Sequence, residues 1–165
     1  ASIRDPDPVI FLETKKLYRA FKQEVPQEPY TIPLGKASII KEGEDLTLIT
    51  YGSLVHDALQ AAESVKEKYN LEIIDLRSLS PLDHNTIIRS VIKTGRCLIV
   101  HEAPKTLGMA AEIIAIINEQ ALYDLQAPVA RLTGYDTIVP LPKLEKYYQP
   151  SPEKIIRKIH EVMQQ

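Results

Sequence analysis

The pair His101-Glu102 is the first candidate for chemistry in this chain of 165 residues. It follows an apolar run at 96–100 and precedes a short loop with a proline and a glycine, which leads into an apolar pattern of helical length. Ligands of an open α/β sheet bind beyond the carboxyl ends of its strands, and an imidazole beside a carboxylate can take part in acid-base chemistry. We favour the structural alternative, in which His101 hydrogen-bonds a neighbouring loop and Glu102 caps the next helix.

A second candidate is the stretch IDLRSLSPLD, in which Asp75 and Arg77 lie two residues apart. On an extended chain both side chains would point to the same side of the sheet, where a guanidinium can meet a carboxylate in a fixed fork. We expect this pair to pin the loop rather than to act in catalysis. For Tyr147-Tyr148, the pattern leaves open a partner-binding surface or a packed corner.

The motifs of several enzyme classes are absent. No Gly-rich dinucleotide or P-loop pattern follows a predicted strand, and no G-x-S-x-G sequence indicates a hydrolase. The single cysteine excludes an internal disulfide framework, and no His/Cys spacing indicates a zinc site. Twenty basic against 22 acidic residues give a net charge of -2 without a basic block, so neither nucleic acid nor a membrane surface is expected as a partner. The residues alone predict an α/β domain without a complete catalytic set.

The elements that would position the candidate residues alternate regularly from residue 46 onward. Apolar, β-branched runs predict strands, and apolar residues at helical spacing predict helices between them. Asp83 is a good N-cap and Gly95 a good C-terminal stop for one helix, and Ser151 is a good N-cap for the last. The predicted strands are 46–50, 71–76, 96–100 and 129–133, and the predicted helices are 55–69, 84–94, one after Gly108 and one from 152 onward.

The segment KASIIKEGEDLTLITYG has two β-rich runs separated by KEGED, with Gly43 in the turn. This spacing predicts a hairpin, and therefore at least one antiparallel pairing in the sheet. Together with the strand-helix alternation, it predicts an α/β/α sandwich on a mostly parallel sheet with one antiparallel strand.

We expect residues 1–36 to be a linker and extended arm, and residues 37–165 to be one domain. The opening ASIRDPDPV has two Asp-Pro pairs, which disfavour helix, and three prolines at spacings of three and four residues exclude helix further on. The arm is expected to order if Tyr30 and Ile32 find a groove. Because the chain begins without Met and with linker-like residues, we expect it to be a piece of a longer protein.

A family resemblance runs through ordered blocks along the chain, which are EVPQEPYTIPLGKA, GEDLTLITYGSLVHDAL, IIDLRSLSPLDHNTI, SVIKTGR, VHEAPKTLGMAAEI, LQAPVARLTGYDTIVP and YYQPS. With these blocks the chain resembles the C-terminal domain of β subunits of thiamine-diphosphate-dependent 2-oxo acid dehydrogenases, which are related to transketolases. EVPQEPYTIPL, HEAP and GYDT look closest to the branched-chain type, and the pyruvate type is the alternative. The resemblance implies a three-layer α/β/α domain with a mixed five-stranded sheet.

The resemblance also implies a reaction for the complete enzyme. Such an enzyme oxidatively decarboxylates a 2-oxo acid on thiamine diphosphate and transfers the acyl group to lipoyl on the acyltransferase. The diphosphate and Mg²⁺ would be held by the α subunit, and the aminopyrimidine ring by the first domain of β. This chain would then bind no cofactor, hold no catalytic residue and be inactive alone. His101 and Glu102 would at most line the route of the substrate or lipoyl arm.

The partners implied by the resemblance are the α subunit, a second β subunit and the peripheral subunit-binding domain of the acyltransferase. In the family, an acidic residue just before the Ala-Pro of the LxAP block commonly meets a basic partner residue. This chain has Gln126 there, which keeps hydrogen bonding but loses the ion pair. Asp124, Asp136 and Glu145 are alternative anchors. The expected compartment is the cytoplasm, or the mitochondrial matrix if the source is eukaryotic.

Two competing interpretations remain. The last domains of transketolases and deoxyxylulose-phosphate synthases share this fold, and there the reaction would be ketol transfer or carboligation. The other alternative is a stand-alone α/β module that binds an anion at a helix N-terminus.

Overall fold

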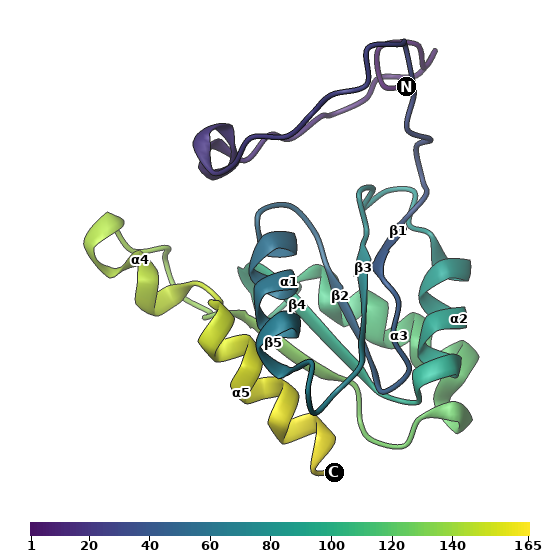
Figure 1. The fold of residues 1–165 in the computed structure, drawn as a ribbon, viewed down its shortest axis with the longest axis vertical. Helices are drawn as coiled ribbons and strands as arrows, with labels where there is room; N and C mark the ends of the chain where they lie inside the picture. The colour runs from purple at the N-terminus through teal and green to yellow at the C-terminus, as the bar shows by residue number, and fades with distance from the viewer.

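Figure 1 shows a five-stranded sheet in the computed structural model, which describes residues 1–165. The strand order is β1-β3-β2-β4-β5. Strands β2 to β5 run parallel, and β1 pairs antiparallel with β3. The predicted mixed sheet is confirmed. The strands are β1 (Ser38–Lys41), β2 (Leu46–Thr50), β3 (Leu71–Asp75), β4 (Cys97–Pro104) and β5 (Ala130–Gly134).

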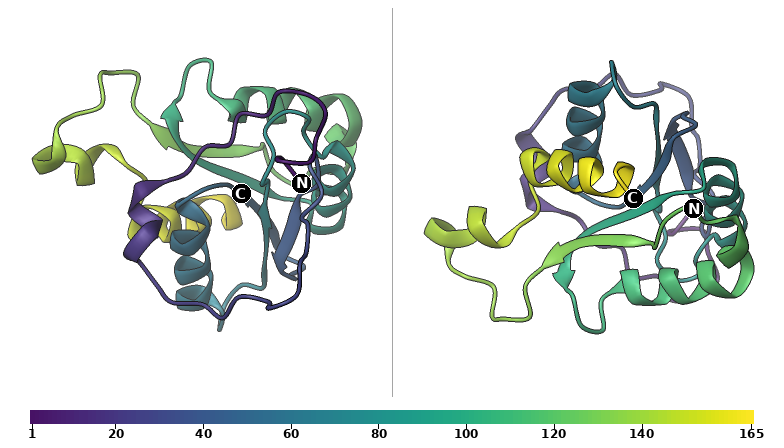
Figure 2. Two further views of the ribbon diagram at one scale, coloured as in Figure 1. Left: turned by 90° about the horizontal axis from the view of Figure 1, so that it is seen from above. Right: turned by 90° about the horizontal axis from the view of Figure 1, so that it is seen from below.

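Helices cover both faces of the sheet and complete the expected three layers (Figure 2). Helices α1 (Leu54–Val65) and α5 (Pro152–Met163) pack on one face, and α2 (His84–Thr94) and α3 (Met109–Ala121) pack on the other. The shorter elements are two 3-10 turns, η1 (Lys15–Arg19) and η2 (Leu122–Asp124), and helix α4 (Pro142–Tyr148). No helix has both the length and the apolar character needed to cross a membrane.

Two separate apolar cores lie on the two faces because successive side chains of a strand point to opposite sides. In β2, Leu46 and Leu48 face α1 and α5, whereas Ile49 faces α2 and α3. All five residues of β2 are buried, as expected for a central parallel strand. The sheet is therefore a rigid platform that places loops from β2, β3, β4 and β5 along its carboxyl edge.

The predicted hairpin between the first two strands is wrong, because β3 lies between β1 and β2. Gly43 permits the crossing, since a Cβ there would overlap the backbone of Leu71 and Glu72. The amide groups of Glu44 and Asp45 donate to the Asn70 carbonyl at 3.0 Å each and close the crossing. The turn signal identified a chain reversal, but β3 is buried over its first four residues and gains more from two strand neighbours than from one.

The helix termini are largely as predicted. Asp83 caps α2 by accepting from the Thr86 amide at 3.3 Å, and Gly95 ends that helix with a φ of 66°. Ser151 caps α5 by accepting from the Lys154 amide at 3.4 Å. The predicted helix 55–69 ends earlier, at Val65, and the predicted strand 96–100 continues to Pro104. His101 and Glu102 therefore belong to the strand itself.

The N-terminal arm, residues 1–36, runs outside the sheet above its carboxyl edge (Figure 1). It contacts the domain at the start of α1, where Lys16 pairs with Asp57 at 3.4 Å and the Phe21 ring lies 4.3 Å from that of His56. Its end contacts the loop before α2, where the Gly35 amide donates to Ser78 Oγ at 3.0 Å. Tyr30 stays 59% exposed, so it does not fill a groove in this chain. Much of the arm's apolar surface is exposed and available for contact with another protein surface.

Candidate functional site

The candidate site is the carboxyl edge of the sheet, where His101 and Glu102 meet the loop between β2 and α1. His101 is 1% exposed, and its ring stacks on that of Tyr51 with 6.3 Å between centroids. Glu102 accepts a hydrogen bond from Ser53 Oγ at 2.5 Å. Because neighbours on a strand point to opposite sides, the imidazole and the carboxylate do not act as one acid-base pair.

His101 holds the beginning of α3. Its Nε2 accepts the amide hydrogen of Ala110 at 3.3 Å, and this requires an unprotonated Nε2. Burial lowers the pKa of His101 and outweighs the opposing effect of the Ala103 backbone; the charge of Arg131 adds a smaller effect in the same direction as burial. His101 is thus a neutral acceptor beneath the surface.

The expectation that Glu102 caps the next helix is wrong. Its partner Ser53 precedes α1, the helix that follows β2, so the carboxylate connects β4 to an earlier part of the chain. Burial raises the pKa of the neighbouring Tyr51, and the charge of Glu102 raises it further. The edge is therefore a connected structural cluster with one half-buried carboxylate.

Asp75 and Arg77 contact each other, but through a turn rather than along an extended strand. Arg77 has a φ of 56°, so the chain turns after β3, and its amide donates to Asp75 Oδ1 at 3.1 Å. The guanidinium Nε lies 3.9 Å from Asp75 Oδ2, without a two-bond fork. Burial raises the pKa of Asp75, against the opposing effect of Arg77. The pair stabilises the loop conformation between β3 and α2.

The four acidic or amide docking candidates do not lie together. Asp124 and Gln126 precede β5 at the amino edge, whereas Asp136 and Glu145 follow it at the carboxyl edge. Asp136 accepts from the amide and the hydroxyl of Thr106 at 2.8 Å each, and these bonds lower its pKa. Glu145 accepts from Gln149 at 2.8 Å. Both carboxylates at the carboxyl edge thus already serve contacts within the chain.

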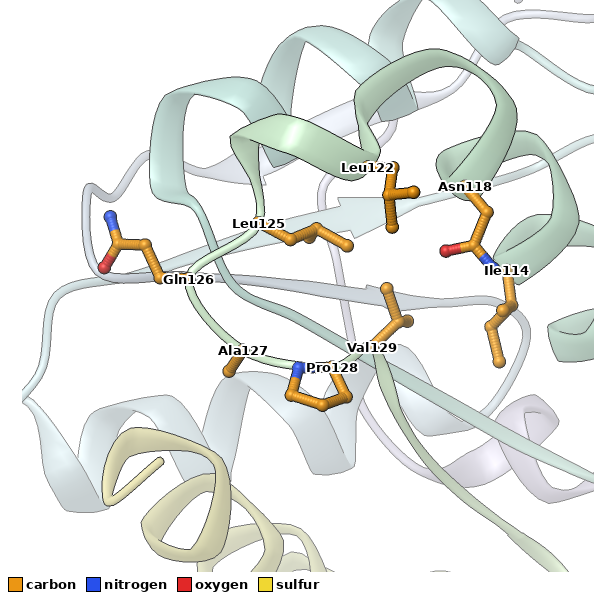
Figure 3. A pocket seen from close by; sticks show the side chains of 8 residues that line it. All are labelled: Ile114, Asn118, Leu122, Leu125, Gln126, Ala127, Pro128 and Val129. Atoms are coloured by element: carbon orange, nitrogen blue, oxygen red, sulfur yellow. The ribbon is translucent and has the colours of Figure 1, made fainter.

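Gln126 lies at the rim of a hollow of about 490 Å³, with its amide turned away from the other lining side chains (Figure 3). The amide accepts a hydrogen bond from Arg96 and packs over Gly95, where a Cβ would lie 2.6 Å from Nε2. The hollow is lined by Ile114, Asn118, Leu122, Leu125, Gln126, Ala127, Pro128 and Val129. It is a mostly apolar surface with one amide and one guanidinium at its edge.

Tyr147 and Tyr148 differ: one side chain is exposed, as in a partner-binding surface, and the other is packed, as in a corner. Tyr148 is 4% exposed and packs against Gly134, whereas Tyr147 is 62% exposed. Tyr147 belongs to a second hollow of about 300 Å³ formed by the segment after β5 and by α4. We call this segment, residues 135–147, the tyrosine segment; its exposed apolar side chains are Tyr135, Ile138, Val139, Leu141, Leu144 and Tyr147.

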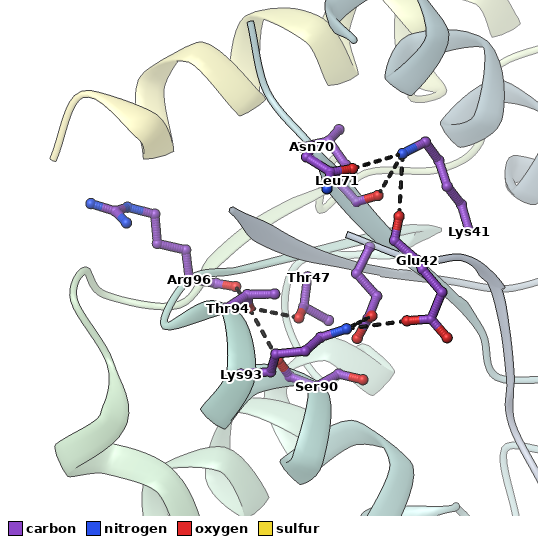
Figure 4. Close-up of polar contacts among 10 residues, drawn as sticks. Lys41, Glu42, Thr47, Asn70, Leu71, Ser90, Lys93, Thr94 and Arg96 are labelled. Carbon is purple, nitrogen blue, oxygen red and sulfur yellow. Dashed lines mark hydrogen bonds and ion pairs between the residues drawn. The ribbon is translucent and has the colours of Figure 1, made fainter. Parts of the chain in front are cut away.

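Sequence reasoning missed a charged cluster at the amino edge (Figure 4). Glu72, in β3, is fully buried and pairs with Lys93 of α2, which also reaches Glu42 at 3.2 Å. Burial is the largest single effect and would raise the pKa of Glu72, but the hydrogen bonds from Lys93 and Ser90, the contact with Glu42 and the charge of Lys93 together lower the pKa. The signal was present as an acidic residue between the apolar residues Leu71 and Ile73 of a predicted strand.

The described residues do not fit a metal or diphosphate site. No group of three or more His, Cys, Asp or Glu side chains is arranged to hold a metal ion. The loops at the carboxyl edge also lack the Gly-rich sequence of a phosphate cradle.

The model of the family "Transketolase, C-terminal domain" matches residues 35–155. The β subunit of the pyruvate dehydrogenase E1 component from Acholeplasma laidlawii is 51% identical over 163 residues, which are 96% of this chain and 50% of that protein. The protein of the same name from Bacillus subtilis (strain 168) is 48% identical over 99% of this chain and 51% of its own length. This chain thus spans about half the length of these curated relatives.

Among solved structures, a protein described as "Split gene transketolase, inactive beta4 tetramer" superposes with a TM-score of 0.72. The match covers 86% of this chain and 46% of that one at 22% identity, which supports the fold alone. The family match, the close relatives and the shared fold agree, and the chain belongs to the family of transketolase C-terminal domains.

Proposed function

We propose that this chain is the C-terminal assembly domain of the β subunit of a thiamine-diphosphate-dependent 2-oxo acid dehydrogenase. The complete enzyme decarboxylates a 2-oxo acid oxidatively and passes the acyl group to lipoyl on an acyltransferase. The observation that carries the proposal is the identity of 48–51% to named pyruvate dehydrogenase E1 β subunits across nearly the whole chain. Because those relatives are bacterial, we place the enzyme in the cytoplasm.

We propose pyruvate as the substrate of the complete enzyme. The names of the relatives support pyruvate, whereas the blocks EVPQEPYTIPL, HEAP and GYDT favoured a branched-chain 2-oxo acid. The branched-chain assignment is not confirmed and remains the alternative that a substrate comparison must address.

Thiamine diphosphate, when bound with Mg²⁺ in the complete enzyme, supplies the electron sink for decarboxylation. We assign none of its contacts to this chain, because the donor set described above fits neither the metal ion nor the diphosphate. The part played by these residues is to hold surfaces in place for the other subunits.

Two surfaces support the assembly role. In the arm, Ile10, Phe11 and Leu12 are 86%, 72% and 84% exposed. The tyrosine segment exposes a second apolar surface at the carboxyl edge. Contiguous apolar surface of this kind marks sites of contact with other protein surfaces. We propose that these two surfaces meet the α subunit and the second β subunit.

For the peripheral subunit-binding domain of the acyltransferase, we propose the hollow beside Gln126. Its apolar lining suits a small helical domain, and its rim carries the Gln126 amide at the position where the family resemblance implies an acidic residue. Arg96 adds a positive charge at that rim, so a basic partner residue would gain little there. Docking would then depend more on apolar contact than on an ion pair.

The test is to co-express the full-length β chain with its α partner and to measure thiamine-diphosphate-dependent decarboxylation of pyruvate and of branched-chain 2-oxo acids side by side. The 165-residue chain alone is the control. Turnover by the assembly with none from the control supports the assembly role and identifies the substrate. Cofactor binding or turnover by the isolated chain would overturn the proposal.

A further inference from the structure

Helix α3 begins without a capping side chain of its own. Its N-cap residue is Gly108, which has no side chain to accept from the first free amides. Such amides are normally satisfied by Ser, Thr, Asp or Asn at the N-cap. Here the acceptor comes from β4, because His101 Nε2 takes the amide hydrogen of Ala110, the second residue of the helix.

The helix start is shaped around the imidazole. A Cβ at Gly108 would lie 2.6 Å from His101 Cε1 and 3.1 Å from Nε2, and it would also overlap the carbonyl oxygen of Pro104. The backbone of Gly108 has a φ of -74°, which any residue can adopt, so the glycine is required by the close approach of the ring. The His101 ring therefore packs directly against the backbone of the connection between β4 and α3.

A protonated imidazole would be unfavourable in this position for three reasons. It could no longer accept from Ala110, it would place a positive charge at the positive end of a helix dipole, and it would be almost fully buried. His101 Nδ1 makes no hydrogen bond in this structure, and the effect of the Ala103 backbone, which favours the charged ring, is outweighed by burial. The ionisable groups on the elements around it are Tyr51, Glu102, Lys105, Glu112 and Arg131.

None of these groups offsets such a charge. Arg131 repels it, and the Tyr51 ring, with 6.3 Å between the centroids, lies at a distance where the attraction of a cation to an aromatic face is weak. The Glu102 carboxylate is bonded to Ser53 on the other side of the strand. Lys105 carries a like charge, and Glu112 points into solvent on an exposed part of α3.

The imidazole also controls one end of the loop Lys105–Leu107. The far side of this loop is held from β5 and the segment after it, because Arg131 donates to the Lys105 carbonyl at 3.0 Å and Asp136 accepts from the Thr106 amide at 2.8 Å. Leu107 is 97% exposed and has a φ of 58°. The loop therefore presents one leucine in a strained conformation between two attachments.

We propose that His101 is a pH-sensitive latch, which in its neutral form closes the start of α3 onto β4 and which releases the loop Lys105–Leu107 when it takes up one proton. The proton comes from solvent and adds to the Nε2 lone pair, and the hydrogen bond from Ala110 breaks. The other attachments of the loop are preserved in this step, so the change is local. The latch acts whatever enzyme the chain serves.

The test is hydrogen exchange of the Ala110 amide in the 165-residue chain, followed by NMR between pH 5 and 8 and corrected for the intrinsic exchange rate. If opening exposes a histidine with the ordinary pKa of 6.5 and takes up one proton, the opening constant rises about fivefold between pH 6.5 and 5.5. His101→Gln can accept the same bond but cannot titrate, so its protection is expected to be independent of pH. His101→Phe removes the acceptor, so protection is expected to be low throughout.

His160→Gln is the matched control, because His160 is a half-buried histidine on α5, where its Nδ1 lies 3.4 Å from the Tyr69 hydroxyl. It should retain the pH dependence of Ala110. The ¹⁵N shifts of His101 in the unaltered chain give a second measurement if a variant fails to fold, and they should report a neutral ring protonated at Nδ1 at pH 7. The proposal would be overturned if protection of the Ala110 amide in the unaltered chain did not depend on pH, or if the pH dependence were unchanged in His101→Gln.

Discussion

Each edge of the sheet buries an ionisable side chain within a strand, Glu72 at one and His101 at the other, and the two edges stabilise it in opposite ways. At the amino edge, Glu72 stays charged because Lys93 pairs with it. At the carboxyl edge, His101 stays neutral because it is buried without an opposite charge and binds a backbone amide. A buried group is tolerated either as a paired ion or as a neutral hydrogen-bonding group. The first solution locks strands together, and the second can respond to pH.

Loss of the Lys93 ammonium group, the partner of Glu72, should have the largest effect on the free energy of unfolding. Lys93→Met leaves Glu72 buried without its cation, and we expect a loss of about 3 kcal/mol in the free energy of unfolding, measured by urea denaturation at pH 7. In that variant burial raises the pKa of Glu72 in the folded state above the unfolded value. The stability of the variant should therefore be highest below the unfolded pKa of Glu72 and be lost as the pH rises from there through the raised folded pKa.

The double variant Glu72→Leu/Lys93→Met is the control for this prediction. Replacement of the whole buried pair by apolar groups of similar volume should restore stability to within about 1 kcal/mol of the unaltered chain. A single Lys93→Met variant as stable as the unaltered chain would show that the pair at the amino edge does not matter for stability.

Steric fit at the carboxyl edge should have the next largest effect. Gly108→Ala brings a methyl group against the His101 ring and the Pro104 carbonyl, so we expect a loss of about 2 kcal/mol by the same measurement. In a His101→Ala background the ring is gone, and the cost should shrink by about 1 kcal/mol. Equal costs in both backgrounds would mean that the helix start is not fitted to the imidazole.

The hydrogen bond between the neutral His101 and Ala110 should contribute less to the free energy of unfolding. His101→Phe leaves the buried Ala110 amide without an acceptor and should cost about 1–2 kcal/mol at pH 7, measured by thermal and urea unfolding. Because folding lowers the pKa of His101, its contribution is complete above the ordinary value of 6.5 and is lost as the pH falls below it. The stability difference between the unaltered chain and His101→Gln should accordingly narrow or reverse between pH 7 and 5.

A charge change in the exposed part of the amino edge should have the smallest effect. Gln126→Glu should tighten binding of a basic peripheral subunit-binding domain about two- to fivefold in calorimetry with the assembled enzyme, since exposed ion pairs contribute little and Arg96 competes for the carboxylate. Arg96→Gln in the same background should increase the gain. An unchanged affinity in both variants would remove this position from the docking surface.

Much of the fold was predictable because it depends on local chemistry. Asp83 and Gly95 identified both ends of α2, and the apolar run at 46–50 identified the central strand. The same local signals failed to identify the strand partner of β1, since Gly43 indicates that the chain reverses and not which strand fills the space beside it. The ordered sequence blocks led to the family without any knowledge of the fold.

The candidate site was less predictable because its contacts join distant parts of the chain. The HEAP motif identified His101 and Glu102 as residues at a strand end, but their partners, Ala110 and Ser53, lie on two different helical connections. Glu72 was visible as an acidic residue in an apolar strand, and only its packing against α2 showed that it is a paired ion.

By itself the sequence determined the helix ends, the strand runs, the mixed character of the sheet and the family, because capping, turn formation and apolar periodicity act over a few residues. The tertiary structure decided where β3 lies and which of two buried ionisable groups is charged. Those outcomes depend on burial and on side chains brought together from separate elements, and no local pattern contains that information.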